Sequence, residues 1–99
     1  MRYSRKIVLN CPEGATLRLE NVVEEFIKQG VQFIAVVGRD CARVEDLIDE
    51  IVVGDGRSDR FILTSSHADE TVADAIAFAR CLTGKYAGDD VQVVELLPP

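Results

Sequence analysis

The sequence contains few aromatic residues and few basic residues. It has no Trp, two Tyr, four Phe and a single His in 99 residues. Proteins that bind single-stranded nucleic acids stack bases on several aromatic side chains, and this chain offers no such set. The formal net charge of -6 comes from 17 acidic and 11 basic side chains and repels phosphate backbones. We therefore expect no nucleic-acid partner.

Long apolar runs and paired cysteines are also missing. No apolar run approaches the roughly 20 residues that span a bilayer. The apolar segment that follows the first basic residues is only Ile7–Leu9, whereas a signal-peptide core has about 7–15 residues. Three cysteines without a CxxC spacing leave at least one thiol unpaired. These features predict free thiols, no membrane contact and a cytoplasmic location.

The motifs that bind common cofactors are absent. The chain has neither GxGxxG nor GxxxxGK[ST], which counts against a dinucleotide site and against a phosphate-binding P-loop. No pair of residues has CxxC, HxxxH or HExxH spacing. We therefore expect no cofactor and no metal, although Cys11, Cys41 and His67 together offer ligands that zinc accepts.

Apolar strand-like runs alternate with amphipathic helical stretches along the whole chain. Strands are predicted over residues 5–10, 33–37, 61–64 and 91–96. Helices are predicted between Thr16 and Gly30, between Asp40 and Gly54, and from Asp69 or Glu70 to Leu82. Residues 1–99 should form one domain, with flexible ends at 1–4 and 97–99.

This β-α-β-α-β-α-β order indicates an α/β protein with a mostly parallel, four-stranded sheet and right-handed crossovers. Because three strands are almost continuously apolar, helices should cover both faces of the sheet. The fold class is thus a small three-layer α/β/α sandwich, similar to flavodoxin-like and Rossmann-like folds, with strand order 2-1-3-4.

Open parallel sheets bind ligands at the carboxyl ends of their strands, where the strand order reverses. With the order 2-1-3-4 this crevice lies between the first and third strands. The polar and reactive residues expected along this edge are Cys11, Gly14, Thr16, Asp40, Cys41, Ser65, Ser66, His67 and Asp69.

Cys11 is the candidate nucleophile, because a thiol just before a helix N-terminus is favoured as thiolate. The stretch Cys11-Pro-Glu-Gly-Ala-Thr16 resembles the phosphoryl-accepting cysteine loop of phosphotransferase-system IIB proteins of the lactose/cellobiose type. This resemblance implies phosphoryl transfer on Cys11. The stretch is also similar to the C-x5-R loop of low-molecular-weight tyrosine phosphatases, but Leu17 stands at the arginine position and Arg18 comes one residue late. The structural alternative is a small buried thiol that closes a strand.

His67 has three possible roles on sequence grounds. It is the acid/base partner of Cys11, a metal ligand, or an exposed residue in the loop before a helix. Ser66 and Asp69 fit an S-x-x-D capping signature. A catalytic triad of Ser66, His67 and Asp69 is disfavoured, because neighbours on one tight turn rarely point at a common atom.

Three functional classes remain. The main hypothesis is a non-enzymatic binding domain whose crevice takes a protein partner or a small polar or anionic ligand. The second is an enzyme or phosphocarrier with Cys11 as nucleophile, His67 as acid/base, and Thr16, Ser66 and Arg18 as anion contacts. The third is a homodimer formed through an edge strand, either 91–96 or the second strand. The acidic outer face of the second helix is a solvated surface or, alternatively, a docking site for a basic partner; it carries Glu45, Asp46, Asp49 and Glu50.

Overall fold

Strands and helices alternate in the computed structural model, which describes residues 3–54, 61–88 and 90–96. In chain order the elements are β1 (Lys6–Cys11), α1 (Leu19–Lys28), β2 (Phe33–Gly38), α2 (Cys41–Val53), β3 (Leu63–Ser66), α3 (Val72–Arg80), the short 3-10 helix η1 (Gly84–Tyr86) and β4 (Val91–Glu95). This order confirms the predicted α/β class.

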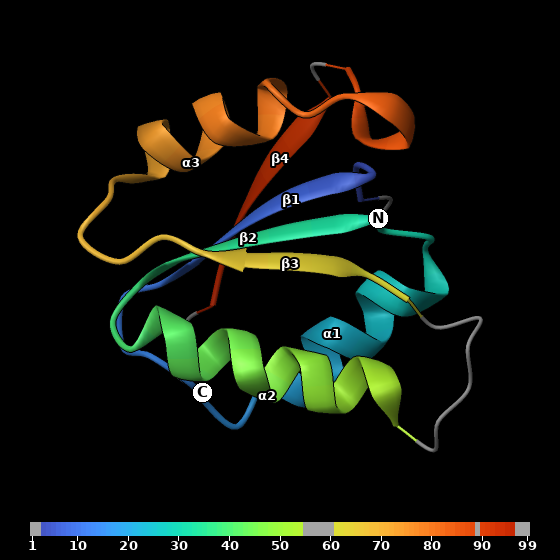
Figure 1. Cartoon of the computed structure of the whole chain (residues 1–99). Helices are drawn as coiled ribbons and strands as arrows, with labels where there is room; N and C mark the ends of the chain where they lie inside the picture. Colours follow the sequence, from blue (N-terminus) through green and yellow to red (C-terminus); the bar gives the residue numbers. More distant parts are fainter. Residues whose placement is uncertain (1–2, 55–60, 89, 97–99) are drawn as a thin grey trace.

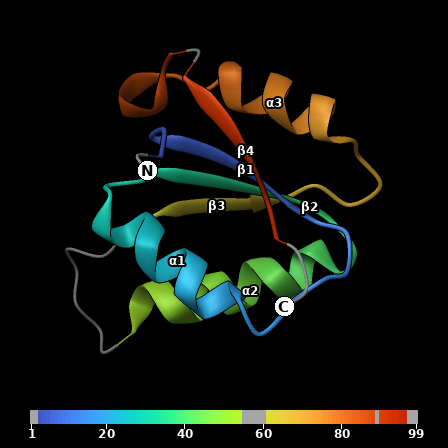
Figure 2. The same cartoon turned by 180° about the vertical axis from the view of Figure 1, so that it is seen from behind.

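The sheet is entirely parallel and its strands lie in the order β3-β2-β1-β4. Helices α1 and α2 lie on one face and α3 lies on the other, which confirms the three-layer sandwich (Figure 1). Seen from behind, α1 runs beside α2 beneath the sheet (Figure 2). None of the described helices is long and apolar enough to cross a membrane.

The predicted strand order 2-1-3-4 is wrong. The first two crossovers step in the same direction, from β1 to β2 and from β2 to β3, so their helices share one face. The third crossover returns past β2 and β1 to place β4 beside β1. Because crossovers are right-handed, reversing the direction moves the helix to the opposite face, where α3 lies.

In this order β2 and β3 exchange the central and outer positions that were predicted for them in the sheet. β2 was expected at an edge but lies between β1 and β3, and its residues from Phe33 to Val37 are buried. β3 was expected in the centre but is an outer strand with four half-buried residues. The apolar run misled the prediction because Phe61 precedes the strand and is 65% exposed, whereas Ile62 is buried. β4 is an outer strand, as predicted.

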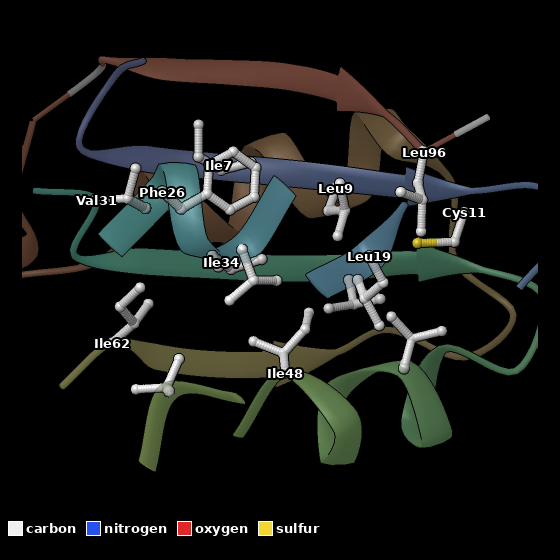
Figure 3. Packing of buried hydrophobic residues seen from close by; sticks show 14 of the residues in the cluster. Ile7, Leu9, Cys11, Leu19, Phe26, Val31, Ile34, Ile48, Ile62 and Leu96 are labelled. Carbon is white, nitrogen blue, oxygen red and sulfur yellow. The ribbon is translucent and has the colours of Figure 1, made fainter. Parts of the chain in front are cut away.

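Alternate strand residues fill two cores, one on each face of the sheet. Facing α1 and α2, the sheet contributes Ile7, Leu9, Cys11, Ile34 and Val36, and Figure 3 shows several of these beside Leu19, Phe26 and Ile48. Facing α3, the sheet contributes Val8, Phe33, Ala35 and Val37, which pack against Ala75 and Ala79.

Glycines end the first two helices as predicted. After α1, Val31 N donates to Phe26 O at 3.0 Å and Gly30 N donates to Ile27 O at 3.2 Å. With Gly30 at φ 78°, this is the paired bonding that glycine permits beyond a helix end. Gly54 ends α2. Asp40 precedes α2 as predicted, but its φ is 51° and its side chain makes no capping bond, so the predicted side-chain cap is wrong.

The N-terminal residues that the structure describes are bound to the rest of the domain. Tyr3 N donates to Gln29 Oε1 at 2.7 Å, and Ser4 Oγ donates to Asp90 Oδ1 at 2.8 Å. The expectation of flexible ends otherwise concerns residues 1–2 and 97–99, which lie outside the described residues. Lys6, within the predicted strand 5–10, is buried in β1 and donates to Ala79 O at 2.7 Å and to Gly88 O. The lysine thereby ties the sheet to the end of α3, where cations are favoured.

Candidate functional site

The predicted site residues form two separate groups rather than one. The strand order puts β2 between β1 and β3, so the loops that follow β1 and β3 do not converge. Cys11, Gly14, Asp40 and Cys41 belong to the end of β1 and β2. Ser65, Ser66, His67 and Asp69 belong to the end of β3, at the outer edge of the sheet.

At the end of β1 the backbone is tightly closed. Cys11 O accepts from Gly14 N at 3.0 Å and from Arg39 N at 2.9 Å, which joins the loops after β1 and β2. Gly38 has φ 109°, and a Cβ at this position would lie 2.4 Å from Cys11 O. Only glycine fits here, because both the conformation and the close approach exclude a side chain.

The Cys11 thiol does not have the environment of a nucleophile. Its side chain is fully buried and lies beside Leu96 (Figure 3). Burial raises the pKa of Cys11 to about 12, with smaller contributions from Cys41 and Glu95. A reactive thiol requires the opposite shift, toward a stable thiolate at neutral pH.

The expected helix dipole is also absent from Cys11, because α1 begins only at Leu19. Thr16 caps no helix; its Oγ1 accepts from Arg18 N at 3.2 Å, and the N-cap position belongs to Arg18. Thr16 therefore organises a turn within the loop. The surface at this edge carries an exposed ion pair, in which Arg39 Nη1 lies 4.0 Å from Glu13 Oε2.

At the end of β3 a hydroxyl, an imidazole and a carboxylate form a continuous hydrogen-bonded chain. Ser65 Oγ lies 2.8 Å from His67 Nε2, and His67 Nδ1 lies 3.3 Å from Glu70 Oε1. The serine and the carboxylate differ from those of the triad that was disfavoured on sequence grounds, Ser66 and Asp69. Strand phase selects the serine, because Ser65 pairs with Ala35 on the α3 face and Ser66 pairs with Val36 on the α2 face.

Of the three roles considered for His67, the exposed loop residue is wrong, because His67 is only 5% exposed. Its backbone N donates to Val36 O at 2.9 Å, which extends the pairing with β2 beyond the end of β3. Phe78 of α3 contacts the imidazole edge-on, with ring centroids 4.7 Å apart. The ring is therefore held from both the sheet and the helix.

A tight turn returns Glu70 to the imidazole. Glu70 N donates to His67 O at 3.3 Å, and Asp69 within the turn has φ 61°. This left-handed conformation is uncommon outside glycine, although Asp tolerates it better than most residues. Helix α3 does not begin at Asp69 or Glu70 as predicted. It follows Thr71, whose capping box with Asp74 replaces the S-x-x-D signature.

A second polar cluster lies on the α2 side of β3. Thr64 Oγ1 lies 3.0 Å from Glu45 Oε2 and 2.7 Å from Asp49 Oδ1. These carboxylates line a groove of about 320 Å³ between α2 and β3, together with Val52, Val53, Phe61, Ile62 and Leu63. Two of its apolar side chains are well exposed, Phe61 at 65% and Val53 at 58%. The acidic face of α2 was predicted, but its contact with β3 was not, because that contact follows from the strand order.

The cysteines and the histidine do not form the metal site considered from sequence, because His67 bonds Ser65 and Glu70 at the other edge of β2. Among residues 3–54, 61–88 and 90–96, no cluster of three or more His, Cys, Asp or Glu side chains could hold a metal ion.

The chain matches a family described as "Domain of unknown function (DUF7684)" over residues 5–97. It belongs to this family. The DUF7684 match covers all four strands and both ends of the sheet. No curated protein and no solved structure matches the chain.

Proposed function

We propose that this DUF7684 domain is a protein-interaction module that binds an extended, basic segment of a partner along β3. The observation that carries the proposal is the open edge of β3 beside a groove lined by carboxylates and exposed apolar side chains. This keeps the predicted binding role but moves it from the crevice beside Cys11 to the outer strand.

The backbone of β3 supports strand addition. Leu63 N bonds Gln32 O and His67 N bonds Val36 O, so the odd-numbered residues pair with β2. In a parallel ladder the alternate residues, Thr64 and Ser66, direct their N–H and C=O groups away from β2. Extended peptides bind such unpaired edges through main-chain hydrogen bonds.

The groove supports a basic partner. Thr64 Oγ1 contacts both Glu45 and Asp49, but its hydroxyl has one hydrogen and can donate to only one carboxylate at a time. A lysine or arginine from the partner would donate to the other carboxylate, and charge-assisted bonds of this kind are strong. The exposed Phe61 and Val53 side chains would take alternate apolar residues of the same segment.

The same charges disfavour the alternatives. Pairing of two copies through β3 would bring both sets of Glu45 and Asp49 together, and like charges across strands are destabilising. An anionic ligand would meet the same repulsion in a chain of net charge -6. Three unpaired thiols suit a reducing compartment, so the proposal includes a cytoplasmic location.

A fluorescent twelve-residue peptide that alternates valine and arginine would test the proposal by anisotropy, with amide chemical shifts to locate the site. Glu45→Gln/Asp49→Asn should weaken binding at least about tenfold, because charge-assisted bonds contribute about 1.5 kcal/mol or more. The matched control is Asp46→Asn/Glu50→Gln, which removes the same charge from exposed positions of α2 and should change affinity less than about twofold.

Strand addition also requires free backbone N–H groups along β3. Ser66→Pro removes an N–H that points away from β2, so the fold should remain while peptide binding falls. Equal weakening by both double variants would reduce the effect to bulk charge and overturn the proposal. So would shifts confined to β4, or a protein that dimerises through β3 in sedimentation experiments.

A further inference from the structure

The chain of Ser65, His67 and Glu70 has the arrangement of an activated serine. We propose that Ser65 is the nucleophile of an acyl-transfer site, with His67 as its general base and Glu70 as the residue that positions His67. The substrate class is small, neutral carboxylic esters. This site lies on the α3 face of β3, opposite the groove between β3 and α2, and it is independent of peptide binding.

These catalytic roles are assigned from which ring nitrogen of His67 contacts the serine and which contacts the carboxylate. The hydroxyl of Ser65 lies 2.8 Å from Nε2 and the carboxylate of Glu70 lies 3.3 Å from Nδ1. With its proton on Nδ1, held by the carboxylate, the imidazole presents a free lone pair at Nε2 to the serine hydroxyl. Serine hydrolases on unrelated folds share this polarity, which is recognised by geometry rather than by chain order.

The imidazole is held in place for this role. It is 5% exposed, Phe78 packs against it, and the His67 backbone N–H is bonded to β2. Glu70 reaches Nδ1 only because Asp69 adopts φ 61° in the turn. Backbone conformations of this kind cost free energy and gather at functional sites.

The serine itself is accessible to a small molecule. Ser65 is half-buried, and α3 packs mainly over β1, β2 and β4 rather than over β3. Phe78, at 43% exposure, and the half-buried Leu63 provide apolar surface for a short acyl group. Asp69, Glu70 and Asp74 are all exposed and acidic, which favours neutral over anionic esters.

The reaction needs only the ester and water. Ser65 Oγ attacks the carbonyl carbon and its proton passes to His67 Nε2. The carbon–oxygen bond to the leaving alcohol then breaks, and the alcohol takes that proton, leaving an ester on Ser65. Water, deprotonated by Nε2, attacks the carbonyl carbon of this ester. The bond from that carbon to Ser65 Oγ breaks, Oγ takes the proton back from Nε2, and the acid is released.

Labelling with a fluorophosphonate, read by mass spectrometry of the intact protein and its peptides, tests the assignment. The wild type should gain one label on Ser65, with loss of fluoride, and Ser65→Ala should gain none. Ser66→Ala is the matched control, because its hydroxyl faces the α2 side, and it should retain labelling within about threefold. The rate should rise with pH in the wild type and lose this dependence in His67→Gln, which a purely structural histidine would not produce.

Glu70→Gln tests the positioning role without disturbing the buried ring, since the Glu70 side chain is 45% exposed. It should slow labelling, and the hydrolysis of p-nitrophenyl acetate, at least about tenfold, because positioned acid–base groups contribute about a hundredfold or more. His67→Gln should slow both further, with folding checked by circular dichroism. An unlabelled Ser65, an equal loss in Ser66→Ala, or an unchanged rate in Glu70→Gln would overturn the proposal.

Discussion

The ends of β1 and β3 are similar in sequence and opposite in structure. Potentially reactive residues stand at the end of each strand: Cys11 ends β1, and Ser65 and His67 stand at the end of β3. At β1 the Cys11 thiol is buried in the core, and backbone hydrogen bonds to Cys11 O join the surrounding loops. At β3 the reactive side chains bond to one another beside an open strand edge.

The position of each strand in the sheet explains the difference. β1 lies between β2 and β4, so its last residues are covered by neighbours on both sides, and Leu96 and Leu19 complete the covering of Cys11. Among the described residues β3 has one neighbouring strand, β2, so Ser65 is half-buried and Glu70 is exposed, although the His67 ring is buried. A strand end is thus a plausible site only where the adjacent strands leave it uncovered.

Gly38→Ala should reduce the free energy of unfolding most, because it adds a side chain where the backbone at the end of β1 is tightly packed. The new Cβ would lie 2.4 Å from Cys11 O at a φ of 109°. Strained backbone and overpacking each cost about 1–3 kcal/mol, so we expect a loss of about 4 kcal/mol in the free energy of unfolding. Urea denaturation followed by circular dichroism measures this loss.

Gly30→Ala is the control for this change. Gly30 also has a positive φ, 78°, but a Cβ there would meet nothing within 4 Å. It should cost only about 1 kcal/mol, the conformational term alone. Similar losses for both variants would mean that the end of β1 is not tightly closed.

Alkylation of the cysteines should separate the buried thiol from an exposed one. Cys81 is exposed, whereas Cys11 is buried and its pKa is raised to about 12. At pH 8 in the native protein, iodoacetamide should modify Cys11 at least about a hundredfold more slowly than Cys81, because Cys11 reacts only after the structure opens. Mass spectrometry of the peptides gives both rates.

The pH dependence of this reaction follows from the same shift. A thiol with a raised pKa stabilises the fold below the pKa of the unfolded chain, near 8.5, and that stabilisation is lost as pH rises toward 12. Cys11 should therefore remain slow up to alkaline unfolding. Rapid modification of Cys11 at pH 8, with Cys81 no faster, would restore the nucleophile hypothesis.

Hydrophobic periodicity predicted the elements of this fold but not their neighbours. The spacing of Val44, Ile48 and Val52 indicates which face of α2 is buried. Patterns of this kind led to the correct prediction of a three-layer sandwich. Strand order depends on which helix covers which face, and no single segment records that. The run from Phe61 to Leu63 therefore predicts a central strand, although only Ile62 is buried.

The candidate site was predictable to the same degree. The stretch from Ser65 to Glu70 stood out as a polar cluster at a strand end, but the partners of His67 depend on atomic detail. A shift of one residue in the strand exchanges the faces of Ser65 and Ser66. The start of α3 likewise could not be chosen between the two S/T-x-x-D signatures without knowing how far β3 extends.

The smallest predicted change in stability tests where α3 begins. It therefore also tests how long the segment between β3 and α3 is. Thr71 Oγ1 accepts from Asp74 N at 3.1 Å, and Thr71 N donates to Asp74 Oδ2 at 3.0 Å. Thr71→Ala removes the cap and should lower the free energy of unfolding by about 1 kcal/mol. Ser66→Ala alters the signature that does not cap a helix, and it should cost less than about 0.5 kcal/mol.

A titration of Asp74 gives this prediction a second readout. The hydrogen bond from the Thr71 backbone lowers the pKa of Asp74, and the Thr71 side chain lowers it further. A lowered pKa means that the charged cap stabilises the fold above the carboxyl pKa of the unfolded chain, near 3.9, and is lost as pH falls through the lower value in the folded state. In Thr71→Ala the carboxyl resonance of Asp74 should titrate at a higher pH, and in Ser66→Ala it should not move. If Ser66→Ala shifted this titration instead, α3 would begin nearer to β3, and Glu70 could not turn back to His67 as it does here.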